Sequence, residues 1–160
     1  MWRFLHLPLG EWLFFVCVPY ACLFVLACVR SYVPDSAWRL SRKVVVGTAF
    51  GFLVLAWRFR DLGYTGSVFL SVGLALVAME ACVPATIRSK NFWVAMGLTY
   101  LPFGIVNGVL TGLPIVLYDD AQNLAFRVGP IPVEDFFFSF SMLALAVWVQ
   151  DGVERRRGRP

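Results

Sequence analysis

Charged residues are scarce in this 160-residue chain: they make up 15% of it, whereas hydrophobic residues make up 59%. A soluble domain of this size needs more polar groups to cover its surface, so the composition excludes an ordinary soluble fold. The mean hydropathy of +0.73 agrees with that exclusion. We therefore interpret the chain as an integral membrane protein.

The residues and motifs of most metal and cofactor sites are also lacking. The chain has one histidine, and its four cysteines lie within apolar runs and form no Cys-x-x-Cys pair, as expected of small buried hydrophobes. Gly-x-Gly-x-x-Gly, a Walker loop and Gly-x-Ser-x-Gly do not occur, which excludes the usual nucleotide-binding and triad chemistry. Basic residues do not cluster with interleaved aromatics. We expect no metal, no cofactor and no nucleic-acid partner.

Apolar runs bounded by basic residues, proline or glycine predict an all-α bundle of about five transmembrane helices. The runs cover residues 12–29, 44–57, 65–83, 92–113 and 133–149, and a basic tail follows over 151–160. The second run is short, so its flanking arginines would extend toward the lipid headgroups. The first run could instead be a cleaved signal peptide, but Glu11 and the length of the run favour a retained helix.

Basic residues divide unequally between the two ends of the predicted bundle. If the helices alternate in direction, one face carries four of the 14 basic residues: Arg3, Arg58, Arg60 and Arg127. The other face carries the remaining ten: Arg30, Arg39, Arg42, Lys43, Arg88, Lys90, Arg155, Arg156, Arg157 and Arg159. Positive residues accumulate on the cytoplasmic side, so we predict a multi-pass cell-membrane protein with its N-terminus outside and its C-terminus in the cytoplasm.

Two predicted helices begin with the same pattern of proline followed by acid. Residues 130–135 lead into the last run with Glu134 and Asp135, and residues 8–11 lead into the first run with Glu11. Proline suits the first turn of a helix, and the partial positive charge at a helix N-terminus favours anions. Carboxylates at the ends of membrane helices are costly unless they have a function. Because both helices begin at one face, we predict that Glu11, Glu134 and Asp135 lie close together.

Other polar residues are expected at the same face. Asn107 lies near the end of the fourth run, where it either bonds neighbouring helices or belongs to the site. The loop over 114–129 brings Tyr118, Asp119 and Arg127 there. Phe136 and Phe137, directly after the acid pair, would supply aromatic walls.

This set of groups suits the protonation of an unactivated C=C bond. Burial favours the neutral form of a carboxylic acid, and a second carboxylate close by makes one member of the pair hold its proton. The second carboxylate could then take a proton back from the carbocation. Aromatic faces stabilise a cation without trapping it as a nucleophile would.

Four segments of the sequence resemble the membrane lycopene cyclase domain family: residues 8–22, 106–112, 114–124 and 131–137. The resemblance implies cyclisation of the ψ-ends of lycopene to β-ionone rings, an isomerisation without net redox change. It also implies Glu134 and Asp135 as acid and base, with Glu11 assisting. Lycopene, the lipid bilayer and another cyclase subunit, in a homo- or hetero-oligomer, are the expected partners. Related members cyclise C50 carotenoids, some of them to ε or γ rings.

The chain departs from the family pattern at its first motif. The family usually has two adjacent acids after Pro-Leu, whereas this chain has Gly10 and Glu11. Tandem members also carry further helices before this motif, so the chain could be a fragment or a form that needs a partner subunit. A non-catalytic membrane partner subunit of a carotenoid enzyme is therefore the alternative to a cyclase. A transporter is disfavoured because no ion-pathway pattern runs through the predicted helices.

We predict that a reporter fused after Pro160 is active in the cytoplasm, because ten of the 14 basic residues would lie on that side. A matched fusion after Asp61, in the second predicted connection, should report the outside. The opposite pair of signals would contradict the predicted topology.

Overall fold

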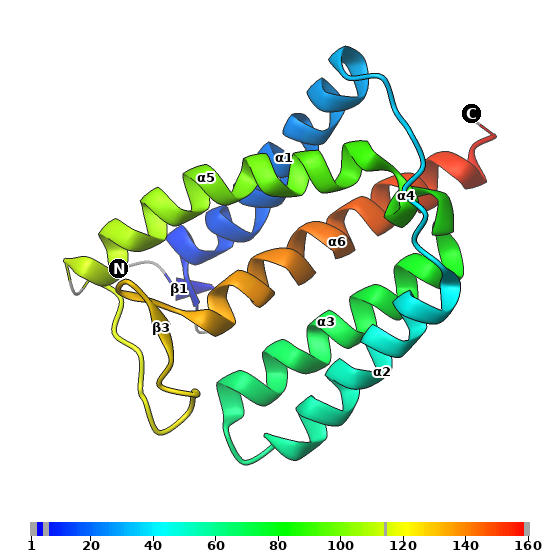
Figure 1. The fold of residues 1–160 in the computed structure, drawn as a ribbon. Coiled ribbons are helices and arrows are strands. Elements are labelled where there is room, and N and C mark those ends of the chain that lie inside the picture. The colour runs from blue at the N-terminus through cyan, green and yellow to red at the C-terminus, as the bar shows by residue number, and fades with distance from the viewer. Residues whose placement is uncertain (1–2, 5–6, 114, 159–160) are drawn as a thin grey trace.

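The computed structural model describes residues 3–4, 7–113 and 115–158, with side chains from Trp12 onward. These residues form helices joined by short connections, with two small hairpins (Figure 1). The helices are α1 (Leu9–Tyr32), α2 (Arg42–Arg58), α3 (Gly63–Cys82), α4 (Pro84–Arg88), α5 (Lys90–Gly112) and α6 (Val133–Arg156). The hairpins pair β1 (Arg3–Phe4) with β2 (Leu7–Pro8), and β3 (Arg127–Val128) with β4 (Ile131–Pro132), both antiparallel.

Long apolar helices confirm the predicted all-α membrane bundle. Among the described residues, four segments are long and apolar enough to cross a membrane: 12–32 in α1, 63–82 in α3, 90–112 in α5 and 133–156 in α6. Helix α2 has 17 residues, the lower limit of the roughly 17–25 that a spanning helix uses. Its passage through the bilayer stays a prediction.

Helix α6 extends past the end that its apolar run indicates. The run ends near 149 and a tail was expected from 151, yet the helix continues to Arg156. Asp151 explains the extension, because its side chain faces inward and bonds to two other helices. The short helix α4 and the two hairpins were not expected from the sequence; Pro84 occupies the first turn of α4, where proline is tolerated.

The helices pack in the order α2, α3, α6 and then α1 with α5 (Figure 1). Helices α1, α3 and α6 run in one direction, and α2 and α5 run in the other. The most deeply buried contact joins α3 to α6, where Ala75, Met79, Ala144 and Val147 are all 0% exposed. Gly73 lets α2 approach α3, since a Cβ there would lie 2.7 Å from a methyl carbon of Leu53.

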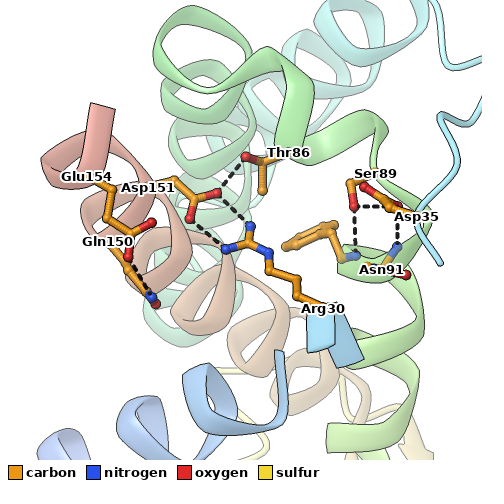
Figure 2. A network of polar contacts seen from close by, with 9 residues as sticks. Arg30, Asp35, Thr86, Ser89, Asn91, Gln150, Asp151 and Glu154 are labelled. Carbon is orange, nitrogen blue, oxygen red and sulfur yellow. Dashed lines mark hydrogen bonds and ion pairs between the residues drawn. The ribbon is translucent and has the colours of Figure 1, made fainter. Parts of the chain in front are cut away.

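A polar network fixes the end of the bundle at which α1, α3 and α6 terminate (Figure 2). Arg30 of α1 donates two hydrogen bonds, of 2.9 and 2.8 Å, to the carboxylate of Asp151 in α6. The same carboxylate accepts a 2.6 Å hydrogen bond from Thr86 of α4. Nearby, the Asp35 carboxylate accepts hydrogen bonds from the Ser89 hydroxyl and from the main-chain N–H of Asn91. These bonds connect the α1–α2 connection to the start of α5.

We predict that Asp151→Asn lowers the free energy of unfolding by about 2 kcal/mol, which corresponds to about 4–8 °C in Tm. The change removes the charge that the Arg30 guanidinium binds while keeping the side-chain shape. A third of the Arg30 side chain (34%) stays exposed, so the loss should stay below that of a fully buried ion pair. Thermal unfolding in detergent micelles measures it.

Glu154→Gln is the matched control, because the exposed Glu154 carboxylate accepts from the Gln150 side-chain amide one turn earlier, and among the described residues its charge acts on Arg30 without a direct bond. A Tm for Asp151→Asn equal to that of the control would show that the network does not stabilise the bundle.

Candidate active site

The first turn of α6 carries two buried carboxylates. Glu134 is 0% exposed and Asp135 is 3% exposed. Pro132 precedes the helix and ends β4, so the β3–β4 hairpin delivers the chain directly into the first turn. The hairpin turns at Gly129, whose φ of +63° lies in the left-handed region that favours glycine. The amide of Val133 donates to the Phe126 carbonyl at 3.0 Å and closes this entry.

The two oxygens of the Glu134 carboxyl group have different surroundings. Oε1 accepts two hydrogen bonds of 2.7 Å each, one from the Thr65 hydroxyl in α3 and one from the Leu124 amide in the loop. Oε2 is also buried, but no described group donates to it or accepts from it. An orphaned carboxyl oxygen in an apolar interior is costly for the anion, and it is an atom on which a proton can reside.

Asp135 has three donors, and they come from three different elements. The Tyr64 hydroxyl of α3 donates to Oδ1, while the Tyr118 hydroxyl of the loop and the Asn107 amide of α5, at 3.0 Å, donate to Oδ2. Three donors satisfy a carboxylate anion well. The pKa of Tyr118 is raised above its ordinary value by burial and by the Asp135 carboxylate, so the phenol stays a donor.

Gln122 of the loop caps the helix that brings Tyr64 and Thr65 to the acids. Helix α3 has Leu62 at its N-cap position, which offers no side-chain cap. The Gln122 side chain accepts from the Gly63 amide at 3.2 Å, and its backbone carbonyl accepts from the amides of Tyr64 and Thr65 at 3.1 and 3.4 Å. The loop therefore satisfies the first amides of α3 and contacts the acid pair at the same time.

Two open hollows lie away from the acid pair. One is bordered by α2 and the start of α3 and includes Trp57 and Arg60; the other is bordered by the ends of α3 and α6. Histidine, cysteine and carboxylate side chains form no cluster of three or more within the described ranges. The arrangement at the acid pair supports proton chemistry.

Comparison with protein families identifies the chain. The family described as Lycopene cyclase matches residues 1–29 and 61–151, which is most of the chain. The chain belongs to the lycopene cyclase family. The unmatched residues 30–60 contain the α1–α2 connection and α2. Searches of curated proteins and of solved structures return no match.

In this lycopene cyclase family member, two of the four polar residues predicted to support the site contact the acid pair and two do not. Asn107 and Tyr118 donate to Asp135. Asp119 is exposed and accepts from the Ala121 amide within its own loop. Arg127 forms an ion pair with Asp120, so the loop neutralises this charge locally. Glu11 lies in the first turn of α1, but its side chain is outside the described residues, and its approach to Glu134 stays a prediction.

Phe136 and Phe137, which follow the acid pair, pack on different sides of α6. The Phe136 ring packs against α5, with its centroid 5.2 Å from that of Phe103 and 6.0 Å from that of Tyr100. The Phe137 ring packs against α2 and α3, 5.4 Å from Phe52 and 5.8 Å from Phe69. Aromatic rings therefore flank helix α6 on two sides within the turn that follows the carboxylates.

The sequence analysis missed four groups that hold the acids or their neighbours: Tyr64, Thr65, Gln122 and the Leu124 amide. Alternation of helix directions contains a signal for two of them, because it places the start of the third run at the same end as Glu134. Gln122 and the Leu124 amide had no such signal, since a loop glutamine and a main-chain N–H form no recognisable pattern.

We predict that Gln122→Ala destabilises the protein by about 1 kcal/mol, the usual cost of losing a side-chain helix cap. The backbone carbonyl of residue 122 remains, so only the hydrogen bond from the Gly63 amide to the Gln122 side chain should be lost. Hydrogen exchange at the amides of residues 63–65 should accelerate. Gln150→Ala is the control, because among the described residues the Gln150 side-chain amide donates to Glu154 alone, at the other end of the bundle. Unchanged exchange at 63–65 would contradict the capping role.

Proposed function

We propose that this chain is a lycopene cyclase that closes the ψ-ends of lycopene into β-ionone rings by proton transfer from Glu134. The observation that carries the proposal is the asymmetric acid pair at the start of α6: Glu134 has one buried oxygen without a partner among the described residues, whereas Asp135 has three donors. Membership of the family supports carotenoid cyclisation as the general activity.

The donor pattern supports different roles for the two acids in the proposed reaction. Thr65 and the Leu124 amide both bind Oε1 of Glu134, so its transferable proton belongs on Oε2. Asp135, with donors on both oxygens, carries the negative charge of the pair. A fixed anion beside the proton donor favours a carbocation over its neutral precursor in the same place.

The reaction then proceeds without an added reactant. The Glu134 proton goes to C2 of the terminal C1=C2 bond and leaves a tertiary cation at C1. The electron pair of C5=C6 forms the C1–C6 bond and moves the cation to C5. Loss of the C6 proton restores a C5=C6 bond, and the proton goes to a carboxylate of the pair. Protons and electrons balance, as an isomerisation requires.

In the proposed reaction, aromatic side chains near Glu134 stabilise the cationic steps. Phe137 follows Glu134 by three residues and Phe138 follows it by four, so both lie one turn above it on the same side of the helix. Ring faces attract a cation through their quadrupoles without forming a bond to it. Phe136 extends this lining toward α5, where its ring meets Phe103.

Substrate must reach carboxylates that are nearly inaccessible in the closed protein. The loop from Ile115 to Phe126 covers the acids and donates to both of them through Tyr118 and the Leu124 amide. We propose that the end of the carotenoid enters from the bilayer when this loop separates from the start of α3. Exclusion of water after the loop closes protects the cation from being captured as an alcohol.

Gly10 supports a second candidate, a partner subunit that keeps the fold without full activity, because it stands where the family usually has an acid. Expression of the chain alone and together with an intact relative in lycopene-producing cells separates the two. A cyclase yields ring-bearing products on its own or on pairing. A non-catalytic partner yields no cyclic product on its own, and the products formed with an intact relative do not depend on its Glu134.

We predict that Glu134→Gln lowers product formation by about 10²–10⁴-fold while the protein stays inserted, because glutamine keeps the shape but has no proton to give. Glu11→Gln should reduce activity less, since its motif already has Gly10 in place of an acid. Chromatography of carotenoids from lycopene-producing cells measures both. Glu154→Gln, outside the site, should leave the product level unchanged.

Near-normal cyclisation by Glu134→Gln, together with loss in Glu11→Gln, would assign the proton donor to the first motif instead. If neither variant changed the products, the carboxylates would serve only the helix starts, and the mechanism would be rejected.

A further inference from the structure

An open hollow of about 570 Å³ lies where α3 and α6 end, far from the acid pair. It is lined by Cys82 of α3 and by one side of α6: Trp148, Val149, Gly152, Val153, Arg155 and Arg156. Its volume lies within the range of about 300–1,000 Å³ that small-molecule sites occupy. The mechanism proposed above uses none of these residues.

The hollow changes from apolar to cationic along α6. From Val149 to Arg156 the helix rises about 10 Å, and each polar headgroup layer of a bilayer is about 5–8 Å thick. Val149, Val153 and Arg156 follow one another at spacings of four and three residues, so they share one side of the helix. Trp148 at the deeper end is a residue type enriched at membrane interfaces. The hollow therefore reaches from the headgroup layer into hydrocarbon.

The two arginines have charge available for a ligand. Arg155 donates one hydrogen bond to the Cys82 carbonyl, which fixes its guanidinium beside the end of α3 and leaves its other N–H groups without acceptors among the described residues. Arg156 forms no ion pair within the described part of the chain. The nearby acids are already engaged, Asp151 by Arg30 and Thr86, and Glu154 by Gln150.

We infer that this hollow binds one anionic phospholipid, with the phosphate on Arg155 and Arg156 and the start of an acyl chain along Val153 and Val149. Guanidinium groups bind phosphate oxygens in a forked geometry, and basic hollows between membrane helices suit anionic headgroups. A free phosphate would leave the apolar half of the hollow empty, whereas a phospholipid matches both halves. This inference is independent of the proposed cyclase reaction.

Native mass spectrometry of the full-length protein tests it. The purified protein is incubated in detergent with phosphatidylglycerol or with zwitterionic phosphatidylcholine, and retained lipid is counted. We expect one phosphatidylglycerol retained per chain and much weaker retention of phosphatidylcholine. Arg156→Gln should weaken phosphatidylglycerol retention about 5-fold, which is the contribution of one arginine near an anionic surface.

Two further variants separate a site from diffuse attraction. Arg157→Gln removes the same charge from the neighbouring residue, which does not line the hollow, and should change retention less than 2-fold. Gly152→Leu keeps every charge but fills the hollow, and it should fold because a Cβ at residue 152 meets no atom within 4 Å. It should weaken retention as much as Arg156→Gln does.

Equal effects of Arg156→Gln and Arg157→Gln would overturn the inference, as would unchanged retention in Gly152→Leu or equal retention of the two lipids. A change of the protein from dimer to monomer mass in Gly152→Leu, without a change in lipid retention, would assign the hollow to a contact between two copies of the chain instead.

Discussion

Two adjacent carboxylates buried at the start of a membrane helix need hydrogen-bond donors, and several surrounding elements supply them. One helix cannot satisfy them, because the donors must approach from the side. Helix α3 supplies the hydroxyls of Tyr64 and Thr65, helix α5 supplies the Asn107 amide, and the loop supplies a phenol and a main-chain N–H. The start of α3 and the end of α5 must therefore lie level with the start of α6.

The opposite end of the bundle is fixed by a different polar network. There the carboxylate of Asp151 binds Arg30 and Thr86, which joins α1, α4 and α6 (Figure 2). Between the two ends the helices meet through small and apolar side chains such as Ala75 and Ala144, and the Ser71 hydroxyl of α3 donates a 2.9 Å hydrogen bond to the Ser141 hydroxyl of α6. The polar contacts therefore restrict how far the helices can shift along their axes, and the small side chains let them approach closely.

The sequence was sufficient for the features that follow from regular spacing or from an unusual residue type. Apolar runs located the long helices, and the acids after Pro132 located the candidate site, because a carboxylate beside a membrane segment is conspicuous. Tyr64 and Thr65 were not found, since single hydroxyl groups near a helix start are common and form no pattern. Asp119 and Arg127 look like site residues in the sequence, but the loop binds them locally through the Ala121 amide and Asp120.

Main-chain groups of the loop form some of the hydrogen bonds that hold the acids and their neighbours. This affects how far the loop sequence can vary. Leu124 holds Glu134 through its amide N–H, and residue 122 holds the amides of Tyr64 and Thr65 through its carbonyl oxygen. Every residue except proline has the N–H, and every residue has the carbonyl. The side chain at position 124 can therefore be exchanged for any residue except proline without removing the contact, so two relatives can share these main-chain contacts while they differ at positions 122 and 124.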